Sequence, residues 1–294
     1  MPFFRQMTRW LVLALCLAWG LTGIALAEDL IITNAPKSAG DKRFIYPKVL
    51  LQAALERTGD RYGPFRLQAY DAPLPRNRAL RELVRGGVTV FEAPTRREWE
   101  LQTLPVRIPI RKGLLGYKVF LIRDEDQKRF AAVQSLEALK RIPLGSGTQW
   151  STTQAFRTLG FTIVDSQHYE GLFHMLTRAR FDWFPRGVNE VFQEFDSRKE
   201  TFPTMRIESA LGLYLPLPSY FFVTPKRPDL AKRIKEGLEE MVADGSLDRL
   251  FLQYHGESLK RAGLERRRIF TLPNPSLTEE TPLHRKGLWL RAQP

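Results

Sequence analysis

The sequence predicts an α/β protein of two lobes, each built on a mostly parallel sheet flanked by helices. Short apolar runs bounded by turn residues alternate with segments whose apolar residues recur at helical spacing, which is typical of repeated strand–helix units. Gly113 and Gly116 precede a long apolar strand, so we expect a first hinge crossing between the lobes there. Residues 211–223 are apolar and interrupted by Pro216 and Pro218, which favours a second, returning crossing.

The first lobe is predicted from apolar runs that read as strands and from helical patterns that stop at glycines. In chain order we expect a strand at 30–33, a helix at 46–57, a strand at 65–70, a helix at 76–84 and a strand at 88–91. The second lobe repeats this order. It should contain a helix capped by Ser135, a strand at 142–144, a helix capped by Ser151, a strand at 161–164, a helix at 169–178 and a strand at 181–184.

Further expectations concern Pro185 and the C-terminal part of the chain. Pro185 lacks the backbone donor that a sheet ladder needs, so we place it at the end of the strand at 181–184. After the return crossing, one helix starts at Pro228 and buries every third or fourth residue up to Gly245, and another starts at Ser246. Residues beyond 270 are rich in proline and lack apolar periodicity, so we expect them to contribute little to the cores.

These elements divide the chain into a leader at 1–27, lobe 1 at 28–114, lobe 2 at 115–214, a return segment of lobe 1 at 215–270 and a basic tail at 271–294. In the leader, Arg5 and Arg9 precede an apolar run and an Ala-x-Ala site that ends at Ala27, the pattern of a cleaved signal peptide. An uncleaved anchor is the weaker alternative, because the run is shorter than the ~20 residues of a spanning helix. We therefore expect a monomer exported to the periplasm.

Composition excludes several classes of function. The single cysteine, Cys16, lies in the leader, so the exported chain would contain no thiol for a zinc finger, an iron–sulfur cluster, a disulfide or nucleophilic catalysis. The 4 histidines lack metal-ligand spacing, and phosphate-loop, zinc-protease and serine-hydrolase motifs are absent. We expect no metal and no cofactor.

The net charge of +13 attracts anionic partners in general. Arg78, Arg81 and Arg85 align on one face of the helix at 76–84, but no aromatic residues that could stack on bases interleave with them. A solvated helix face is the simpler reading, and we expect no nucleic-acid partner.

Two segments carry candidate binding chemistry. The glycine-rich turn at 145–151, with Gly147, Thr148 and Trp150, places a helix N-terminus where a carboxylate or phosphate would bind, although an ordinary capped turn explains it equally well. The segment at 181–187 places Asp182, Trp183 and Arg186 at what we expect to be the C-terminal end of a strand, where open α/β sheets bind ligands. A structural ion pair between Asp182 and Arg186 is the alternative.

Together the segments resemble the extracytoplasmic solute-binding proteins of family 3, as a divergent branch with the type II periplasmic binding fold. Residues 176–182, LTRARFD, look like the family's "L..GR.D" element, and residues 241–256, MVADGSLDRLFLQYHG, are similar to its C-terminal signature. In that family an arginine in a T-x-x-R element holds the ligand carboxylate. The matching residue here is Arg97, with Pro94 where threonine is usual. By the same resemblance, residues 145–148 match the glycine-rich turn and Asp182 the amine-binding aspartate.

The resemblance implies a protein that closes on a small anionic or zwitterionic solute, such as an amino acid, for a membrane transporter or receptor. The family's pattern changes at residues 183–186, so the solute need not be an amino acid. The alternative is a periplasmic dehydratase acting on a prephenate-like acid, for which Glu190 and Glu194 are the candidate acids in lobe 2.

Overall fold

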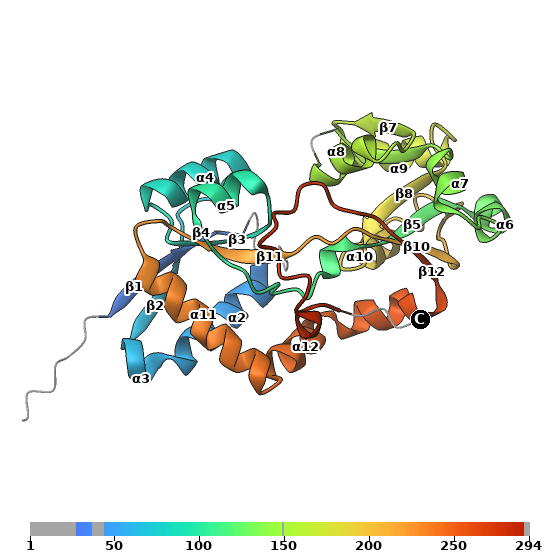
Figure 1. The fold of residues 1–294 in the computed structure, drawn as a ribbon. Coiled ribbons are helices and arrows are strands. Elements are labelled where there is room, and N and C mark those ends of the chain that lie inside the picture. The colour runs from blue at the N-terminus through green and yellow to red at the C-terminus, as the bar shows by residue number, and fades with distance from the viewer. Residues whose placement is uncertain (1–27, 37–43, 149, 291–294) are drawn as a thin grey trace, which may run out of the picture.

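The computed structural model describes residues 28–36, 44–148 and 150–290. The expected signal peptide and its cleavage site lie outside these residues and remain a prediction. Two α/β lobes stand side by side, with chain segments passing between them (Figure 1). Across the described ranges, no helix is both long enough and apolar enough to cross a membrane.

Lobe 1 is built on two small sheets, one of two strands and one of three, which Thr89 connects. The first contains β1 (Asp29–Thr33) and β2 (Phe65–Ala69), and the second contains β3 (Val90–Pro94), β11 (Ser219–Val223) and β4 (Leu104–Val106). β1 and β2 are parallel, whereas β11 returns from the second lobe and therefore runs antiparallel between β3 and β4. Thr89 joins the two sheets, because its N–H donates to the Ile32 carbonyl (2.9 Å) and its hydroxyl accepts from the Ile32 N–H (2.7 Å).

Helices cover both faces of these sheets. They are α2 (Ile45–Arg57), α3 (Gly59–Tyr62), α4 (Arg76–Arg85), α5 (Arg97–Gln102) and α11 (Pro228–Ala243). Successive side chains of β11 point to opposite faces of the sheet and belong to two separate hydrophobic cores. Phe221 and Val223 pack with α2 and α11. Tyr220 and Phe222 pack with α4 and α5. The predicted apolar face of the helix after Pro228 is confirmed. It buries Leu230, Ile234, Leu238 and Met241.

Lobe 2 has a larger mixed sheet with the strand order β12-β10-β5-β8-β6-β7, and β9 also pairs with β5. The strands are β5 (Tyr117–Arg123), β6 (Leu144–Gly147), β7 (Ile163–Ser166), β8 (Trp183–Gly187), β9 (Met205–Ile207), β10 (Leu211–Tyr214) and β12 (Arg268–Thr271). β6, β7 and β8 are parallel, and β5, which enters from the crossing, is antiparallel to β8.

The helices of lobe 2 are short. They are α6 (Gln127–Ala131), α7 (Leu136–Lys140), α8 (Ser151–Thr158), α9 (Tyr169–Thr177) and α10 (Val191–Asp196). Ser135 caps α7 as predicted, since its hydroxyl accepts the N–H of Ala138 (3.2 Å). The expectation for Ser151 is wrong by one residue. It is the first helical residue of α8, and Trp150 occupies the N-cap position without a side-chain cap bond.

β8 begins two residues later than expected, so Pro185 lies within the strand. Pro185 lies opposite Phe120 of β5. The Phe120 carbonyl points away from β8 and accepts the N–H of Glu208 (2.8 Å). β6 pairs with β8 at Trp183 and does not extend to Pro185. Neither neighbouring strand therefore needs an N–H from Pro185, and the sheet tolerates the proline.

The return segment 215–270 was expected to stay in lobe 1, but it does not. α12 (Ser246–Ala262) starts against lobe 1, where His255 packs on the Tyr46 ring (4.9 Å between ring centroids), and ends at lobe 2, where Arg261 pairs with Asp196 (2.8 Å). β12 then adds to the lobe 2 sheet beside β10. The chain thus connects the lobes through the two expected crossings and again through α12.

The expectation of a tail that contributes little to the cores is also wrong. The Trp289 ring is 8% exposed and packs on Gly113, where a Cβ would lie 2.6 Å from the ring. The Leu290 N–H donates to the Lys112 carbonyl (2.7 Å), and the Tyr117 hydroxyl donates to the Leu290 carbonyl (3.0 Å). The tail, red in Figure 1, docks on the first crossing because a glycine there leaves room for a tryptophan.

Candidate functional site

Two adjoining cavities lie between the lobes and form one cleft. The first, of about 430 Å³, is lined by residues 95–97 of lobe 1, residues of the 148–155 segment of lobe 2, Leu215 and Leu217 of the return crossing, and Asn274 of the tail. The second, of about 670 Å³, extends towards α9 and α10. Both are lined by Arg96, Trp150, Thr152 and Leu217, so they adjoin along these four residues.

The lobe 1 wall presents arginines. The Thr95 N–H donates to the Pro218 carbonyl (2.8 Å), which fixes the chain between β3 and α5. Arg97, the predicted carboxylate-binding residue, is exposed and lines the first cavity, whereas Arg96 is half-buried and lines both. Arg76, the first residue of α4, lines the second cavity.

Arg76 is held by its surroundings rather than by an acid. Its Nη2 donates to the Pro94 carbonyl, and its guanidinium lies over the Trp99 ring, 5.3 Å from the centroid. Burial and then the neighbouring charge of Arg96 lower the pKa of Arg76 to about 10. Because the charged form of the guanidinium is destabilised in this way, an anion bound nearby would stabilise it.

The lobe 2 wall is built on the glycine-rich turn. A Cβ at Gly147 would lie 2.4 Å from the Trp150 indole, so this glycine provides space for Trp150 rather than for a ligand. The Thr148 N–H is used by the Ser166 carbonyl (3.1 Å), and Thr148 lines the first cavity. Trp150 stacks on Phe184 (6.0 Å between ring centroids, 11° between planes) and faces both cavities. Gln149, within the same turn, lies outside the described residues.

Arg186 lies at the cleft, but its charge is already paired. Glu194 binds its guanidinium through two hydrogen bonds (2.7 and 2.6 Å), and Glu190 lies 3.1 Å from it. The guanidinium also stacks 4.6 Å from the Trp150 centroid. Burial opposes the charge, yet the two glutamates raise the pKa of Arg186 above its ordinary value.

Two predicted site residues lie elsewhere. Asp182 precedes the first residue of β8, at the end of the strand opposite to the one expected, and its carboxylate binds Arg123 (2.7 Å) and Arg129 (3.2 Å). Trp183 is fully buried in lobe 2, where its indole N–H donates to the Ile142 carbonyl (2.9 Å). Neither lines the cleft, and the Asp182–Arg186 pair considered as an alternative is not formed. The later start of β8 explains all three results.

Sequence reasoning missed three cations of the cleft, namely Arg76, Arg96 and Lys118. Lys118 lies on β5, half-buried, and burial lowers the pKa of its ammonium group. Arg96 lies two residues beyond the C-terminal end of β3, the kind of position where open α/β sheets bind ligands, and this pattern could have identified it. Lys118 and Arg76 have no comparable pattern, because the folding of distant segments brings them to the cleft.

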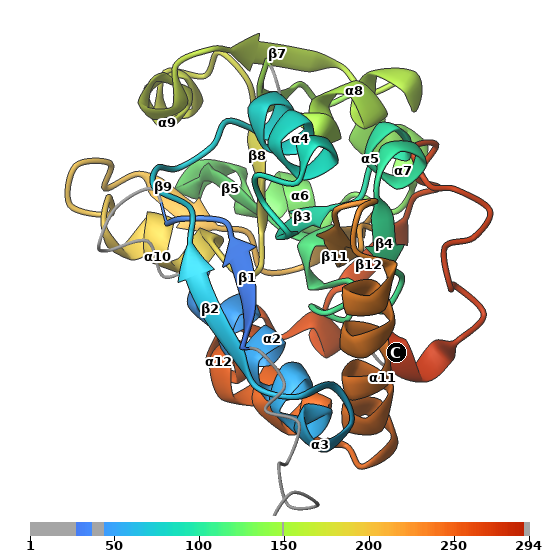
Figure 2. The same cartoon turned by 90° about the vertical axis from the view of Figure 1, so that its left-hand side faces the viewer.

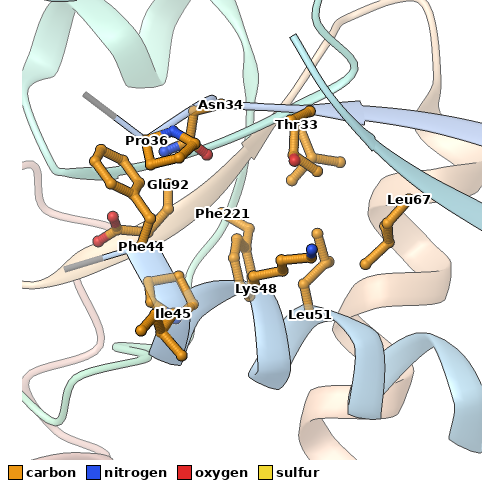
Figure 3. A pocket seen from close by; sticks show the side chains of 13 residues that line it. Thr33, Asn34, Pro36, Phe44, Ile45, Lys48, Leu51, Leu67, Glu92 and Phe221 are labelled. Atoms are coloured by element: carbon orange, nitrogen blue, oxygen red, sulfur yellow. The ribbon is translucent and has the colours of Figure 1, made fainter. Parts of the chain in front are cut away.

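A further cavity, of about 250 Å³, lies within lobe 1 between α2, β1 and β11 (Figure 3). Among the described residues, the charged ones that line it are Lys48 and Glu92, and Glu92 faces Arg111 (3.4 Å). Because a single lobe lines this cavity, movement of the lobes would not enclose a solute in it. Within the described part of the chain, no three His, Cys, Asp or Glu side chains gather where they could hold a metal ion.

Comparison with known proteins identifies solved structures that share this fold. No family model matches the sequence, and no curated protein matches it significantly. Among solved structures, similarity extends to the probable amino-acid ABC transporter extracellular-binding protein ytmK of Bacillus subtilis (TM-score 0.58, 15% identity, 79% of this chain and 99% of that chain). An ancestral arginine-binding protein bound to arginine is also similar (TM-score 0.51, 16% identity, 78% of this chain and 99% of that chain).

A third similar structure comes from a study of glutathione import in Gram-positive bacteria through GshT and the cystine ABC importer TcyBC of Streptococcus mutans. It has a TM-score of 0.53 and 9% identity over 78% of this chain and 95% of that chain. The chain therefore has the two-lobed fold of the type II periplasmic binding proteins. The resemblance expected from the sequence is confirmed at the level of the fold.

Proposed function

We propose that this protein is an extracytoplasmic solute-binding protein whose two lobes close on a small anionic or zwitterionic solute. The observation that carries the proposal is the cleft, because residues of both lobes and of the return crossing line its two adjoining cavities. The lobes are joined by short crossings, so changes of backbone angle near Gly113–Gly116 and Leu215–Pro218 would bring the two walls together. The similar structures that are named as binding proteins support this role.

In this role Arg97 and Arg96 would hold an anionic group from lobe 1, and Thr148 and Trp150 would contact the solute from lobe 2. The protein would act as a monomer. Its closed form would deliver the solute to a membrane transporter, with a membrane receptor as the alternative partner. The leader at 1–27 would direct the chain to the periplasm.

The dehydratase alternative has less support. Glu190 and Glu194 do line the cleft, but both bind Arg186, and Glu194 also accepts a hydrogen bond from the Tyr169 hydroxyl (2.6 Å). Incubation with prephenate-like acids tests this alternative directly, since turnover would show an enzyme and binding without turnover would not.

A thermal-shift screen of amino acids, organic acids and polyamines tests the binding function. A solute at a hundredfold excess over its dissociation constant stabilises the fold by about 2.7 kcal/mol. For lobes of this size, that corresponds to a rise in Tm of about 5–10 °C. Arg97→Ala should reduce the shift strongly, because the anionic group loses a charge-assisted hydrogen bond.

Arg81→Ala is the matched control, since Arg81 is an exposed lobe 1 arginine on α4 that does not line the cleft. A solute that stabilises both variants as well as the unchanged protein would show that the cleft is not its site. No stabilisation by any solute in the screen would contradict the binding function.

A further inference from the structure

The charges of the cleft are unequal on its two walls. Arg76, Arg96 and Arg97 line the lobe 1 wall, and no aspartate or glutamate of the described residues lines that wall with them. No ion pair is formed by these three arginines within the described chain. The charge of Glu92 acts weakly on Arg76, and the Glu92 carboxylate faces Arg111 instead.

The charges of the lobe 2 wall sum to zero, but one of its cations has no ion-pair partner among the described residues. Glu190 and Glu194 both bind Arg186, and together these three groups carry a net charge of −1. Lys118 lies beside them, lines the same cavity, and forms no hydrogen bond or ion pair within 4 Å among the described residues. The described lining of the cleft therefore holds five cationic side chains and two carboxylates.

An ammonium group of a solute finds no excess of carboxylates among the described residues that line this cleft, because Arg186 and Lys118 balance the two glutamates. An α-amino acid needs a carboxylate or several carbonyl acceptors for its ammonium group, because a charge taken from water must be paired. The acid expected for that purpose, Asp182, binds Arg123 and Arg129 away from the cleft. The two glutamates that do line the cleft are used by Arg186.

Burial increases the preference of the cleft for anions. The Nε of Arg76 is buried without a hydrogen-bond partner in the described structure. Burial also lowers the pKa of Lys118 and of Arg76, so each is a desolvated cation that an anion would stabilise. Guanidinium and ammonium groups form strong charge-assisted hydrogen bonds to carboxylate or phosphate oxygens, and these bonds are stronger away from bulk water.

We infer that the solute of this cleft carries at least two anionic groups and no ammonium group. One anionic group would bind the lobe 1 arginines, and another would reach Lys118 of lobe 2. This inference rests on the proposed solute-binding function and names its substrate class, a small di- or tricarboxylate or a phosphate ester that also carries a carboxylate. Two anionic groups would draw the walls together, since one would bind the arginines of lobe 1 and the other Lys118 of lobe 2.

Matched probes test the inference by calorimetry at constant ionic strength, on protein refolded from denaturant to remove retained solute. Succinate is compared with aspartate and glutarate with glutamate, because each pair differs by one ammonium group. Citrate and inorganic phosphate separate the carboxylate source from the phosphate source. We expect at least one of the four ammonium-free anions to bind, and each ammonium-bearing partner to bind about 10- to 100-fold more weakly than its match.

Variants locate the binding. Arg96→Gln and Lys118→Met should each weaken the best anion about 10- to 100-fold. Arg81→Gln removes the same charge from an exposed position of α4 and should leave the affinity unchanged, which excludes a general effect of net charge.

Tighter binding of aspartate or glutamate than of its ammonium-free match overturns the inference but leaves the solute-binding function standing. An anion whose affinity falls equally in all three variants binds the surface and also overturns it. No binding by succinate, glutarate, citrate or phosphate overturns it as well. The function itself then depends on the amino-acid and polyamine arms of the thermal-shift screen.

Discussion

At the scale of single residues, the local structure decides which charges remain available. Arg186 and Arg96 are both arginines at the cleft, yet Arg186 binds two glutamates whereas no acid among the described residues lines the lobe 1 wall with Arg96. Sequence alone marked Arg186 and Arg97 as candidates. It could not distinguish a paired guanidinium from a free one, because the turn from β8 into α10 is what brings Glu190 and Glu194 back to Arg186.

His255 provides a test at this scale. It is 8% exposed between the Tyr46 and Phe251 rings, and its Nε2 lies 3.3 Å from the Arg111 guanidinium. Burial and then the Arg111 charge lower the pKa of His255 to about 3. The unfolded chain therefore binds a proton that the folded chain does not between pH 6.5 and about 3.

Because of this difference, we expect the stabilising contribution of neutral His255 to be complete above pH 6.5 and to be lost as the pH falls towards 3. The loss should be on the order of a few kcal/mol. His255→Gln should flatten the fall of Tm in acid, while His168→Gln, at an exposed histidine, should not. Equal acid sensitivity of all three proteins would show that another group dominates.

At the scale of elements, long periodic helices could be predicted and short strands could not be placed to the residue. α2 and α11 begin and end within one or two residues of the expected positions, because their apolar spacing and terminating residues agree. β8 was misplaced because the local pattern around Pro185 gave a reason to end the strand there. The register of β5 and β9, which permits the proline, is not visible in the local sequence.

The close crossing of α2 and α11 gives a prediction for an element. A Cβ at Gly237 would lie 2.0 Å from the Ala54 carbonyl oxygen, so Gly237→Ala must separate the two helices. We expect it to destabilise the fold by about 1–3 kcal/mol in urea unfolding. Gly256→Ala is the matched control on α12. No atom lies within 4 Å of its Cβ position, so it should stabilise by about 0.5–1 kcal/mol. Similar effects of the two substitutions would contradict the close packing.

At the scale of the whole molecule, the two crossings and the segments that pack on them determine how the lobes can move. The two-lobe plan was predictable because Gly113, Gly116 and the two prolines mark the crossings. The docking of the tail was not, because Trp289 and Gly113 are far apart in the sequence and no periodic pattern links them. α12 and the tail lie along the crossings (Figures 1 and 2), so we expect closure to be a rotation about this side of the molecule.

The central claim is that the two lobes close on a solute, and energy transfer between dyes on the lobes measures this directly. Cys16 is the only cysteine, so a chain expressed from Glu28 with Arg78→Cys on α4 and Thr158→Cys at the end of α8 would carry two dyes. Both positions are exposed, and α4 and α8 lie on facing sides of the two lobes (Figure 1). The solute with the largest thermal shift should increase the transfer efficiency, and Arg97→Ala should require more solute for the same increase. A solute that binds in the calorimeter without changing the transfer efficiency would contradict the account.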